Sequence, residues 1–247
     1  MIDIHCHFLP NIDDGSKSWE ETMEMARMAV SDGVEGAVMT PHWIQGTTWQ
    51  PAPGTVVSLV AEMNERLRAE GIDFTAYPGM EIGIIPDLPR VISDGQVLPL
   101  AEGDFVLIEI PFYSLPMGLE DVIFGIETRG KKAVLAHPER NREFQGSPKR
   151  ILDFVNSGAL VQITAGSLTG GFGDSAKKCS IELAKLGAVH FVASDAHSTR
   201  HRNPVVSDGL SVLRKVVGEE GVDTVIANTY EILRGCPGYK EAVTGKS

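Results

Sequence analysis

Short apolar segments alternate along this sequence with segments of helical periodicity, and most of the apolar segments end at a histidine or an acidic residue. The first of them reads Met1-Ile-Asp-Ile-His5-Cys-His7. Side chains alternate across a strand, so both imidazoles of this His-x-His pair lie on one face, close enough to bind one metal ion. A second pair with the same spacing, Asp195 and His197, ends the last apolar segment. The sequence therefore predicts a metal site built from strand ends.

The order of these segments indicates the fold class. Strands are expected at residues 1–7, 36–42, 74–82, 105–111, 132–137, 159–165 and 188–197, and helices at residues 18–31, 56–70, 118–129, 148–157, 174–186, 205–217 and 223–234. Such alternation is typical of βα units on a parallel sheet, in which the carboxyl ends of the strands share one side. An open sheet would place its outer ligands too far from one centre, so we expect the strands to close into a barrel.

Length and charge narrow the class of protein. The chain has 247 residues, of which 43% are hydrophobic, and this is the usual length of one α/β barrel. We therefore expect a single domain over residues 1–247 that forms a distorted (βα)7 TIM-like barrel. The tail after about residue 235 is expected to be frayed. The net charge of -11 argues against a nucleic-acid or anionic-membrane partner. The sequence contains no apolar run of membrane-spanning length and no basic signal-peptide start, so a cytoplasmic location is expected.

The cysteines and glycines exclude several reaction classes. The three cysteines are too few and too scattered for a disulfide framework or a paired-cysteine zinc site. None of them stands six residues before an arginine, and after Cys179 that place is held by Lys185, which excludes a cysteinyl phosphatase loop. No Gly-x-Ser-x-Gly motif or glycine-rich nucleotide loop follows a strand. The expected chemistry is therefore metal chemistry.

Candidate metal ligands stand at the ends of the expected strands. They are His5, His7, His42, Glu81, Glu109, His137, Asp195 and His197. Taken alone, a histidine at a strand end is more often a solvated or hydrogen-bonded residue than a ligand, but the two i,i+2 pairs favour the metal interpretation. A buried, unpaired Glu109 would cost several kcal/mol, so a metal or an arginine must compensate its charge unless it lies in water. Glu81 is open to the same solvated alternative.

Several loop residues have roles that the sequence leaves open. Trp43 and Trp49 are either the rim of a site for an aromatic substrate or scattered surface residues. His201 follows the last strand and is a further candidate for the substrate rim. The segment Gly170-Gly-Phe-Gly173 is expected to be a plain flexible loop rather than a phosphate-binding loop.

Taken together, the motifs resemble the polymerase-and-histidinol-phosphatase (PHP) family of phosphoesterases. Within it they are most similar to the bacterial CpsB/YwqE-type manganese-dependent protein-tyrosine phosphatases of capsule and exopolysaccharide loci. The matching motifs span nearly the whole chain, in the order Met1-Ile-Asp-Ile-His-Cys-His, Asp13-Asp14-Gly15, Thr40-Pro-His42, Gly79-Met-Glu81-Ile, Leu107-Ile-Glu109, Ala136-His-Pro-Glu-Arg140 and Ala193-Ser-Asp195-Ala-His197 followed by Arg202.

The resemblance implies a complete set of site residues. It adds Asp14 to the eight candidate ligands, assigns three divalent metal ions to the resulting nine residues and makes Glu109 a bridging ligand. It also implies that Arg140 and Arg202 bind phosphate, with Arg200 as the rival of Arg202, and that His42 takes part in catalysis. The implied partner is a tyrosine-phosphorylated protein, such as a tyrosine kinase or chain-length regulator of capsule or exopolysaccharide synthesis.

The types of metal ligand and the chemistry of the leaving group indicate which reaction to expect. Nitrogen and carboxylate ligands without thiolate suit Mn, the metal that the resemblance favours, and also Fe or Zn. A hydroxide held between two metals is expected to attack phosphorus in line, while the third metal and the arginines take up charge on the phosphoryl oxygens. A phenol with a pKa of about 10 leaves with little help, which mildly favours aryl phosphate.

Three alternatives to the tyrosine phosphatase remain. One is a small-molecule phosphatase, for example one that acts on histidinol phosphate. Another is a metal amidohydrolase, which usually bridges its metals with a carbamylated lysine at a strand end, a position that no lysine holds in this sequence. The third is a regulatory or scaffold protein that holds metal without turnover.

Overall fold

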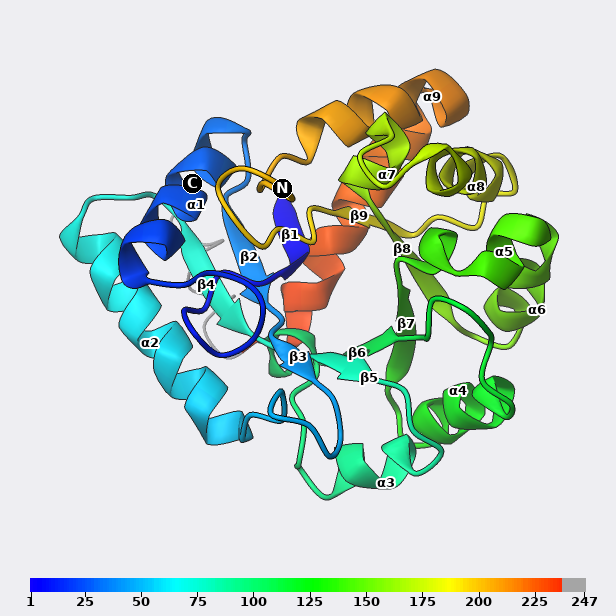
Figure 1. The fold of residues 1–247 in the computed structure, drawn as a ribbon, viewed down its shortest axis with the longest axis horizontal. Coiled ribbons are helices and arrows are strands. Elements are labelled where there is room, and N and C mark those ends of the chain that lie inside the picture. The colour runs from blue at the N-terminus through cyan, green and yellow to red at the C-terminus, as the bar shows by residue number, and fades with distance from the viewer. Residues whose placement is uncertain (237–247) are drawn as a thin grey trace.

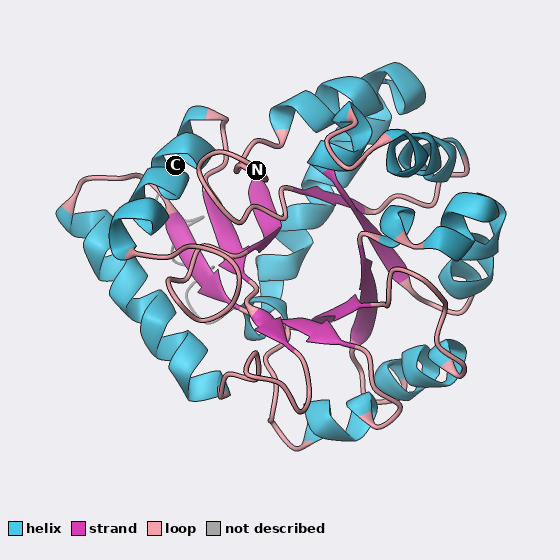
Figure 2. Ribbon diagram, in the orientation of Figure 1, coloured by secondary structure: helices cyan, strands magenta, loops and turns pink. Residues whose placement is uncertain are grey.

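The structure is a computed structural model, and it describes residues 1–236. The strands lie around a common centre, and the helices lie outside them (Figure 1 and Figure 2). The strands are β1 (Ile2–Cys6), β2 (Gly36–Met39), β3 (His42–Trp43), β4 (Thr75–Pro78), β5 (Glu81–Gly83), β6 (Phe105–Glu109), β7 (Lys132–Ala136), β8 (Leu160–Thr164) and β9 (Phe191–Ala193).

The strands pair in parallel, as the sequence predicts. They form a three-stranded sheet in the order β1-β2-β4 and a six-stranded sheet in the order β3-β5-β6-β7-β8-β9. Between β1 and the segment after β9 there is an isolated parallel bridge from Cys6 to Ala196. The amide of Asp195 donates to the carbonyl of His5 over 2.8 Å, and the amide of His7 donates to the carbonyl of Ala196 over 2.9 Å. The predicted α/β class with parallel sheets is confirmed.

Two expected strands are interrupted in the structure. The strand predicted at residues 36–42 divides at Thr40 and Pro41, because a proline has no amide to donate to a neighbouring strand. The strand predicted at residues 74–82 divides after Pro78, at Gly79. A Cβ atom at Gly79 would lie 2.7 Å from Cγ1 of Val38, so only glycine permits this close approach. Each interruption leaves a short second strand, β3 or β5, that begins at a candidate ligand.

The helices cover the outer side of the strands (Figure 2). They are α1 (Trp19–Ser31), α2 (Pro53–Ala69), α3 (Leu88–Ser93), α4 (Leu119–Glu127), α5 (Arg142–Gly146), α6 (Ile151–Asn156), α7 (Ala165–Thr169), α8 (Asp174–Lys185) and α9 (Ser207–Glu231), with the 3-10 turns η1 (Leu100–Glu102), η2 (Pro138–Arg140), η3 (Pro148–Arg150) and η4 (Ile232–Gly235). The two final helices that the sequence predicts are joined in α9, which kinks at Gly218, where φ is 77°. Among the described residues, no helix has the length and apolar character needed to span a membrane.

A capping residue marks the start of the first helix, and two apolar clusters hold the helices and strands together. The Ser18 side chain accepts a hydrogen bond from the amide of Glu21 over 3.3 Å, which caps α1 at its predicted start. Helices pack on strands through one large apolar cluster. A second apolar cluster joins residues of several strands, among them Ile4, Leu107 and Phe191.

The frayed tail expected after about residue 235 falls mainly on residues 237–247, which lie outside the described residues.

Candidate metal centre

The structure brings all nine predicted metal ligands together: seven lie near or after the carboxyl end of a strand, and His42 and Glu81 are the first residues of the short strands β3 and β5. Their donor atoms form four overlapping groups, in each of which the atoms lie within 4.8 Å of one another. The groups are His7, Asp14, His42 and His197; His5, His7 and Glu81; His5, His137 and Asp195; and His42, Glu81 and Glu109. We call these nine residues the ligand cluster.

Glu81 occupies the middle of the ligand cluster. Its Oε2 atom lies 3.2 Å from Nε2 of His5, 3.3 Å from Nε2 of His7 and 3.0 Å from Nδ1 of His42. Its Oε1 atom lies 2.8 Å from Nε2 of His137. Glu109 is more peripheral, because its oxygens approach His42 and His137 only to 3.8 and 3.9 Å. Glu81 is therefore the carboxylate at the middle of the cluster, and the bridging role that the resemblance implies for Glu109 stays a prediction.

The interrupted strands explain this placement. In the pairing of β3 with β5, His42 is directly in register with Glu81. In the pairing of β5 with β6, Glu109 is in register with Gly83, two residues beyond Glu81. The two glutamates therefore stand at different heights along the strands, and only Glu81 lies level with the imidazoles of β1 and β3.

Two further residues orient the histidines of β1. Asp13 accepts a hydrogen bond from Nδ1 of His7 over 2.7 Å and also accepts hydrogen bonds from the amides of Gly15 and His42. Gln162, on β8, lies with Oε1 2.9 Å from Nδ1 of His5. Such partners fix the ring so that Nε2 faces the site. The sequence suggests only a turn for Asp13 and nothing for Gln162, although a polar residue within the apolar segment 159–165 is an available signal.

The donor arrangement fits divalent metal ions. The Oε2 atom of Glu81 is buried and makes no hydrogen bond with any described residue, although three imidazole nitrogens converge on it. Nε2 of His5 and Nε2 of His7 face each other at 3.2 Å. Buried nitrogen and oxygen donors that converge on a shared space are typical of a metal site, and a buried carboxylate oxygen such as Oε2 of Glu81 otherwise needs a hydrogen-bond partner.

Burial and neighbouring charges shift the pKa values of the cluster. Burial lowers the pKa of His137 to about 4, helped by the charge of Arg140, which keeps the imidazole neutral at pH 7. Burial opposes charge on His7 as well, but the Asp13 carboxylate raises the pKa of this imidazole to about 10. Burial and the neighbouring Glu81 raise the pKa of Glu109 to about 7. A divalent cation would compete with the protons that these groups otherwise share.

Asp195 connects the ligand cluster to two arginines. Nη2 of Arg140 lies 2.6 Å from Oδ2 of Asp195, and Nη2 of Arg202 lies 2.6 Å from Oδ1. We call Arg140 and Arg202 the arginine pair. Arg200, the predicted rival of Arg202, is exposed and lines a neighbouring cavity.

The backbone is strained at three residues of this region. His137, Asp195 and Arg202 have φ values of 33°, 51° and 54°, which lie in the left-handed region that residues other than glycine seldom adopt. His137 comes directly after β7 and Asp195 two residues after β9, whereas Arg202 lies on the longer connection between β9 and α9. Strain of this kind is found preferentially at functional sites, where the surrounding contacts hold it in place.

A cavity of about 290 Å³ opens beside the ligand cluster. It is lined by Asp14, His42, Ile44, Trp49, Glu109, Phe112, His137, Arg140 and Arg202. Trp49 stacks on His42 with ring centroids 5.2 Å apart, and Phe112 stacks on His137 at 5.6 Å. Aromatic rings therefore flank the entrance to the cluster on two sides.

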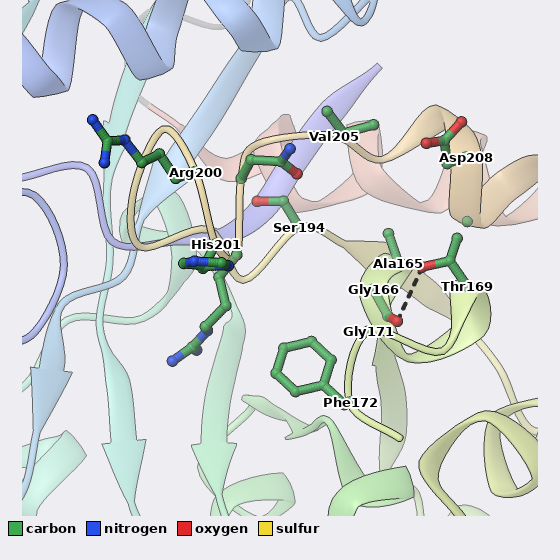
Figure 3. A pocket seen from close by; sticks show the side chains of 13 residues that line it. Ala165, Gly166, Thr169, Gly171, Phe172, Ser194, Arg200, His201, Val205 and Asp208 are labelled. Carbon is green, nitrogen blue, oxygen red and sulfur yellow. Dashed lines mark hydrogen bonds between the residues drawn. The ribbon is translucent and has the colours of Figure 1, made fainter. Parts of the chain in front are cut away.

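The structure corrects one predicted rim residue and relocates another. Trp43 is only 2% exposed and belongs to the large apolar cluster, because it follows His42 on β3 and packs against the helices. Trp49, the other tryptophan considered for the rim, does line the cavity, together with Phe112, which the sequence did not suggest. His201 is exposed and lines the neighbouring cavity, next to Arg200 (Figure 3).

Comparison with known proteins defines the family. A sequence model described as "Capsular polysaccharide synthesis, CpsB/CapC" matches residues 1–234. The chain belongs to the CpsB/CapC family. The family resemblance that the motifs suggest is therefore confirmed.

Relatives of this CpsB/CapC protein cover almost its whole length. Tyrosine-protein phosphatase YwqE of Bacillus subtilis is 38% identical over 234 residues, which are 95% of this chain and 92% of YwqE. Tyrosine-protein phosphatase CpsB of Streptococcus agalactiae serotype III is 27% identical over 244 residues, with 95% and 98% covered.

Solved structures agree with this assignment. A chain from a study of YwqE from Bacillus subtilis and CpsB from Streptococcus pneumoniae, described as unique metal-dependent tyrosine phosphatases, matches with a TM-score of 0.92, 38% identity and 96% of each chain covered. A beta-aspartyl dipeptidase from Fervidobacterium islandicum matches with a TM-score of 0.55 at 17% identity, covering 94% of this chain and 74% of the dipeptidase. At that identity the likeness shows a shared α/β fold and carries no activity to this chain.

Proposed function

We propose that this member of the CpsB/CapC family is a metal-dependent protein-tyrosine phosphatase. The observation that carries the proposal is the composition of a single cavity. Residues of the ligand cluster, both members of the arginine pair and the aromatic side chains of Trp49 and Phe112 line the same space of about 290 Å³. Metal ligands, phosphate-binding cations and aromatic walls together suit the hydrolysis of an aryl phosphate.

The nine residues of the ligand cluster are proposed to hold three divalent ions, with Mn preferred and Fe or Zn as alternatives. Four overlapping donor groups support more than one ion, and the oxygen and nitrogen donors suit all three elements. Glu81 is the best candidate for a shared ligand, since its two oxygens reach four imidazoles. When bound, such ions supply Lewis-acid activation of water and of the phosphoryl group.

The arginine pair is proposed to bind the phosphoryl oxygens. Both guanidiniums line the cavity, and each keeps a buried Nε–H that has no hydrogen-bond partner among the described residues. Guanidinium groups form strong, charge-assisted hydrogen bonds to phosphate and stabilise the charge that develops in the transition state. Only 9% of the Arg140 side chain is exposed against 32% for Arg202, so Arg140 acts in the less hydrated position.

The aromatic walls support a tyrosyl leaving group. Trp49 and Phe112 can hold a phenyl ring by stacking while the phosphate reaches the arginine pair. A phenol with a pKa of about 10 departs without a strong general acid, and none of the described residues of the cavity needs to supply one. We propose that His42 contributes to catalysis by positioning its neighbours, because it contacts both the Glu81 carboxylate and the ring of Trp49.

The wider assignment follows the family. We propose that the substrate is a phosphorylated tyrosine kinase or chain-length regulator of capsular or exopolysaccharide synthesis, and that the reaction takes place in the cytoplasm. We also propose that the strands form a distorted (βα)7 barrel of the PHP type. Parallel pairing throughout and the bridge between Cys6 and Ala196 support such a ring.

The proposed function is tested by substrate choice and metal dependence. The protein would be assayed on a phosphotyrosine peptide, a phosphoserine peptide and histidinol phosphate, with Mn added and after chelation. His42→Ala and Arg140→Ala would be compared with Arg214→Ala, a control on the exposed surface of α9 whose side chain pairs with Glu219.

We expect metal-dependent turnover that is concentrated on phosphotyrosine, strongly reduced in His42→Ala and Arg140→Ala, and retained in Arg214→Ala. Preference for histidinol phosphate would replace the proposal with a small-molecule phosphatase. Turnover that survives complete removal of metal, or no turnover of any phosphomonoester with metal present, would contradict it.

A further inference from the structure

The arginine pair shares one aromatic neighbour, Phe172, which lies on the loop between α7 and α8. The guanidinium carbon of Arg140 stands 3.6 Å from the centroid of the Phe172 ring, and that of Arg202 stands 5.9 Å from it. Cations within about 6 Å of an aromatic face are attracted by the ring quadrupole. A single side chain therefore contacts both proposed phosphate-binding groups.

The surrounding loop is built to keep this ring in place. The flanking glycines Gly170 and Gly173 have φ values of 100° and 88°, a backbone conformation that other residues rarely adopt. A Cβ atom on Gly166 would lie 2.9 Å from Cε2 of Phe172, so the ring occupies space that only a glycine leaves open. The segment expected from its sequence to be a plain flexible loop is thus shaped around Phe172.

Phe172 also lines a second cavity next to the one beside the ligand cluster. It forms one wall of a cavity of about 320 Å³ that Ser194, Arg200 and His201 line as well (Figure 3). Arg202 lines both this cavity and the one beside the ligand cluster. Arg202 therefore borders a second space besides the one beside the ligand cluster, and Phe172 lines that second space with it.

The other contacts of the arginine pair leave this orientation incompletely determined. Arg140 is held at Nη2 by Asp195 and by the hydroxyl of Thr164, both at 2.6 Å. Arg202 is held at Nη2 by Asp195 alone among the described side chains. A contact at one nitrogen fixes a point of the guanidinium but not its plane, whereas a flat ring beneath it fixes the plane.

We propose that Phe172 is a positioning residue that sets the orientation of Arg140 and Arg202 for the phosphoryl group. The inference rests on the proposed function for the identity of the phosphorylated substrate. The ring makes no bond to substrate. It restricts the orientation of both guanidinium planes, so the arginine side chains lose less conformational entropy when phosphate binds.

The experiment compares Phe172→Leu, Phe172→Tyr and Gly166→Ala with the wild type. Phe154→Leu serves as the matched control, because Phe154 is buried on α6 and packs against Phe144, away from the arginine pair. For each variant loaded with Mn, four quantities would be measured: metal content, melting temperature, the dissociation constant of inorganic phosphate by calorimetry, and kcat and KM on an aryl phosphate.

We expect Phe172→Leu to weaken phosphate binding and to lower kcat/KM about tenfold, with the metal content unchanged. Phe172→Tyr keeps the aromatic face and should restore most of the loss. Gly166→Ala should also weaken phosphate binding, because the added methyl group displaces the ring. In an Arg140→Ala background, Phe172→Leu should have a smaller effect.

Wild-type phosphate affinity in Phe172→Leu would overturn the inference. The inference would also be overturned if Phe154→Leu lost as much phosphate affinity as Phe172→Leu and both variants had a lower melting temperature. A Phe172→Tyr variant that bound phosphate as weakly as Phe172→Leu would overturn it too. Failure of the proposed function is distinguishable from these outcomes, because the wild type would then hydrolyse no aryl phosphate, while calorimetry would still report whether Phe172 affects phosphate binding.

Discussion

The ligand cluster and the arginine pair meet at Asp195, but the fold holds them in different ways. His5 and Glu81 stand on β1 and β5, and each imidazole of the cluster contacts at least one carboxylate of it. Arg140 and Arg202 lie on the connections that follow β7 and β9, and Arg202 adopts a strained backbone conformation. The strands and the short segments directly after them therefore position most of the ligands, whereas a few side-chain contacts position the arginines.

The difference has a functional consequence. Neighbouring strands restrain one another through hydrogen bonds, so a ligand on a strand tolerates little displacement. A guanidinium at the end of a long side chain has many rotamers and depends on its neighbours for orientation. We expect substitutions in the ligand cluster to remove metal, and substitutions around the arginine pair to weaken phosphate binding while metal is retained.

The largest effect is expected from Glu81→Gln. The amide keeps the shape of the side chain but removes the charge at the middle of the ligand cluster, so metal content should fall and kcat should drop at least about a thousandfold. Metal analysis and an aryl phosphate assay would measure both, with Glu120→Gln on the exposed face of α4 as control. Full metal content in Glu81→Gln would show that the cluster does not depend on its central carboxylate.

The next effect in size is expected from Arg140→Ala, which should lower kcat/KM about a hundredfold while the metal content stays near that of the wild type. Arg202→Ala should have a smaller effect, since its side chain is more exposed, and Arg200→Ala should have almost none. Kinetic constants for all three variants would measure this order. A larger loss in Arg200→Ala than in Arg202→Ala would reverse the assignment of the second phosphate-binding residue.

Asp13→Asn sharpens the contrast between a ligand and the residue that orients it. Asp13 contacts His7 but is absent from the groups of converging donors, so its loss should weaken metal affinity about ten- to a hundredfold. Activity should return when Mn is supplied in excess. Titration of the chelated protein with Mn would test this, and a variant that stays inactive at saturating Mn would indicate that Asp13 has a direct catalytic role.

The smallest effect on activity is expected at the aromatic wall. Trp49→Ala should raise KM for an aryl phosphate about three- to tenfold, with little change in melting temperature. Trp43→Ala should do the opposite: the buried ring contributes about 3–5 kcal/mol of stability, so the melting temperature should fall while KM changes little. Equal effects of the two substitutions on KM would mean that Trp49 does not contact the substrate.

The residues that the sequence predicts best are those whose position follows from strand periodicity. His5 and His7 share a face because side chains alternate along a strand, and Asp195 and His197 end the last apolar segment in the same pattern. A parallel α/β fold then brings the carboxyl ends of the strands together. The eight candidates at strand ends are accordingly expected in one region, and their donor atoms converge there in the structure.

The residues that the sequence predicts less well depend on register and on loops. Whether Glu81 or Glu109 is central depends on how far β5 and β6 are offset, and hydrophobic pattern does not encode that offset. The pattern places Trp43 on a loop because the break at Thr40 and Pro41 hides the short strand β3. Gln162 and Phe172 contact partners far away in sequence, and no local pattern identifies those partners, although the polar Gln162 stands out in its apolar segment.

The sequence by itself determined the fold class, the metal chemistry and the nitrogen and oxygen donors, because periodicity and residue type are local properties of the chain. Only the tertiary structure decided which carboxylate lies at the centre, which tryptophan faces the cavity and which aromatic ring lies under the arginine pair. Those choices depend on the registers of the strands and the paths of the loops. Both are set by packing between segments that are distant in sequence, so no local pattern contains them.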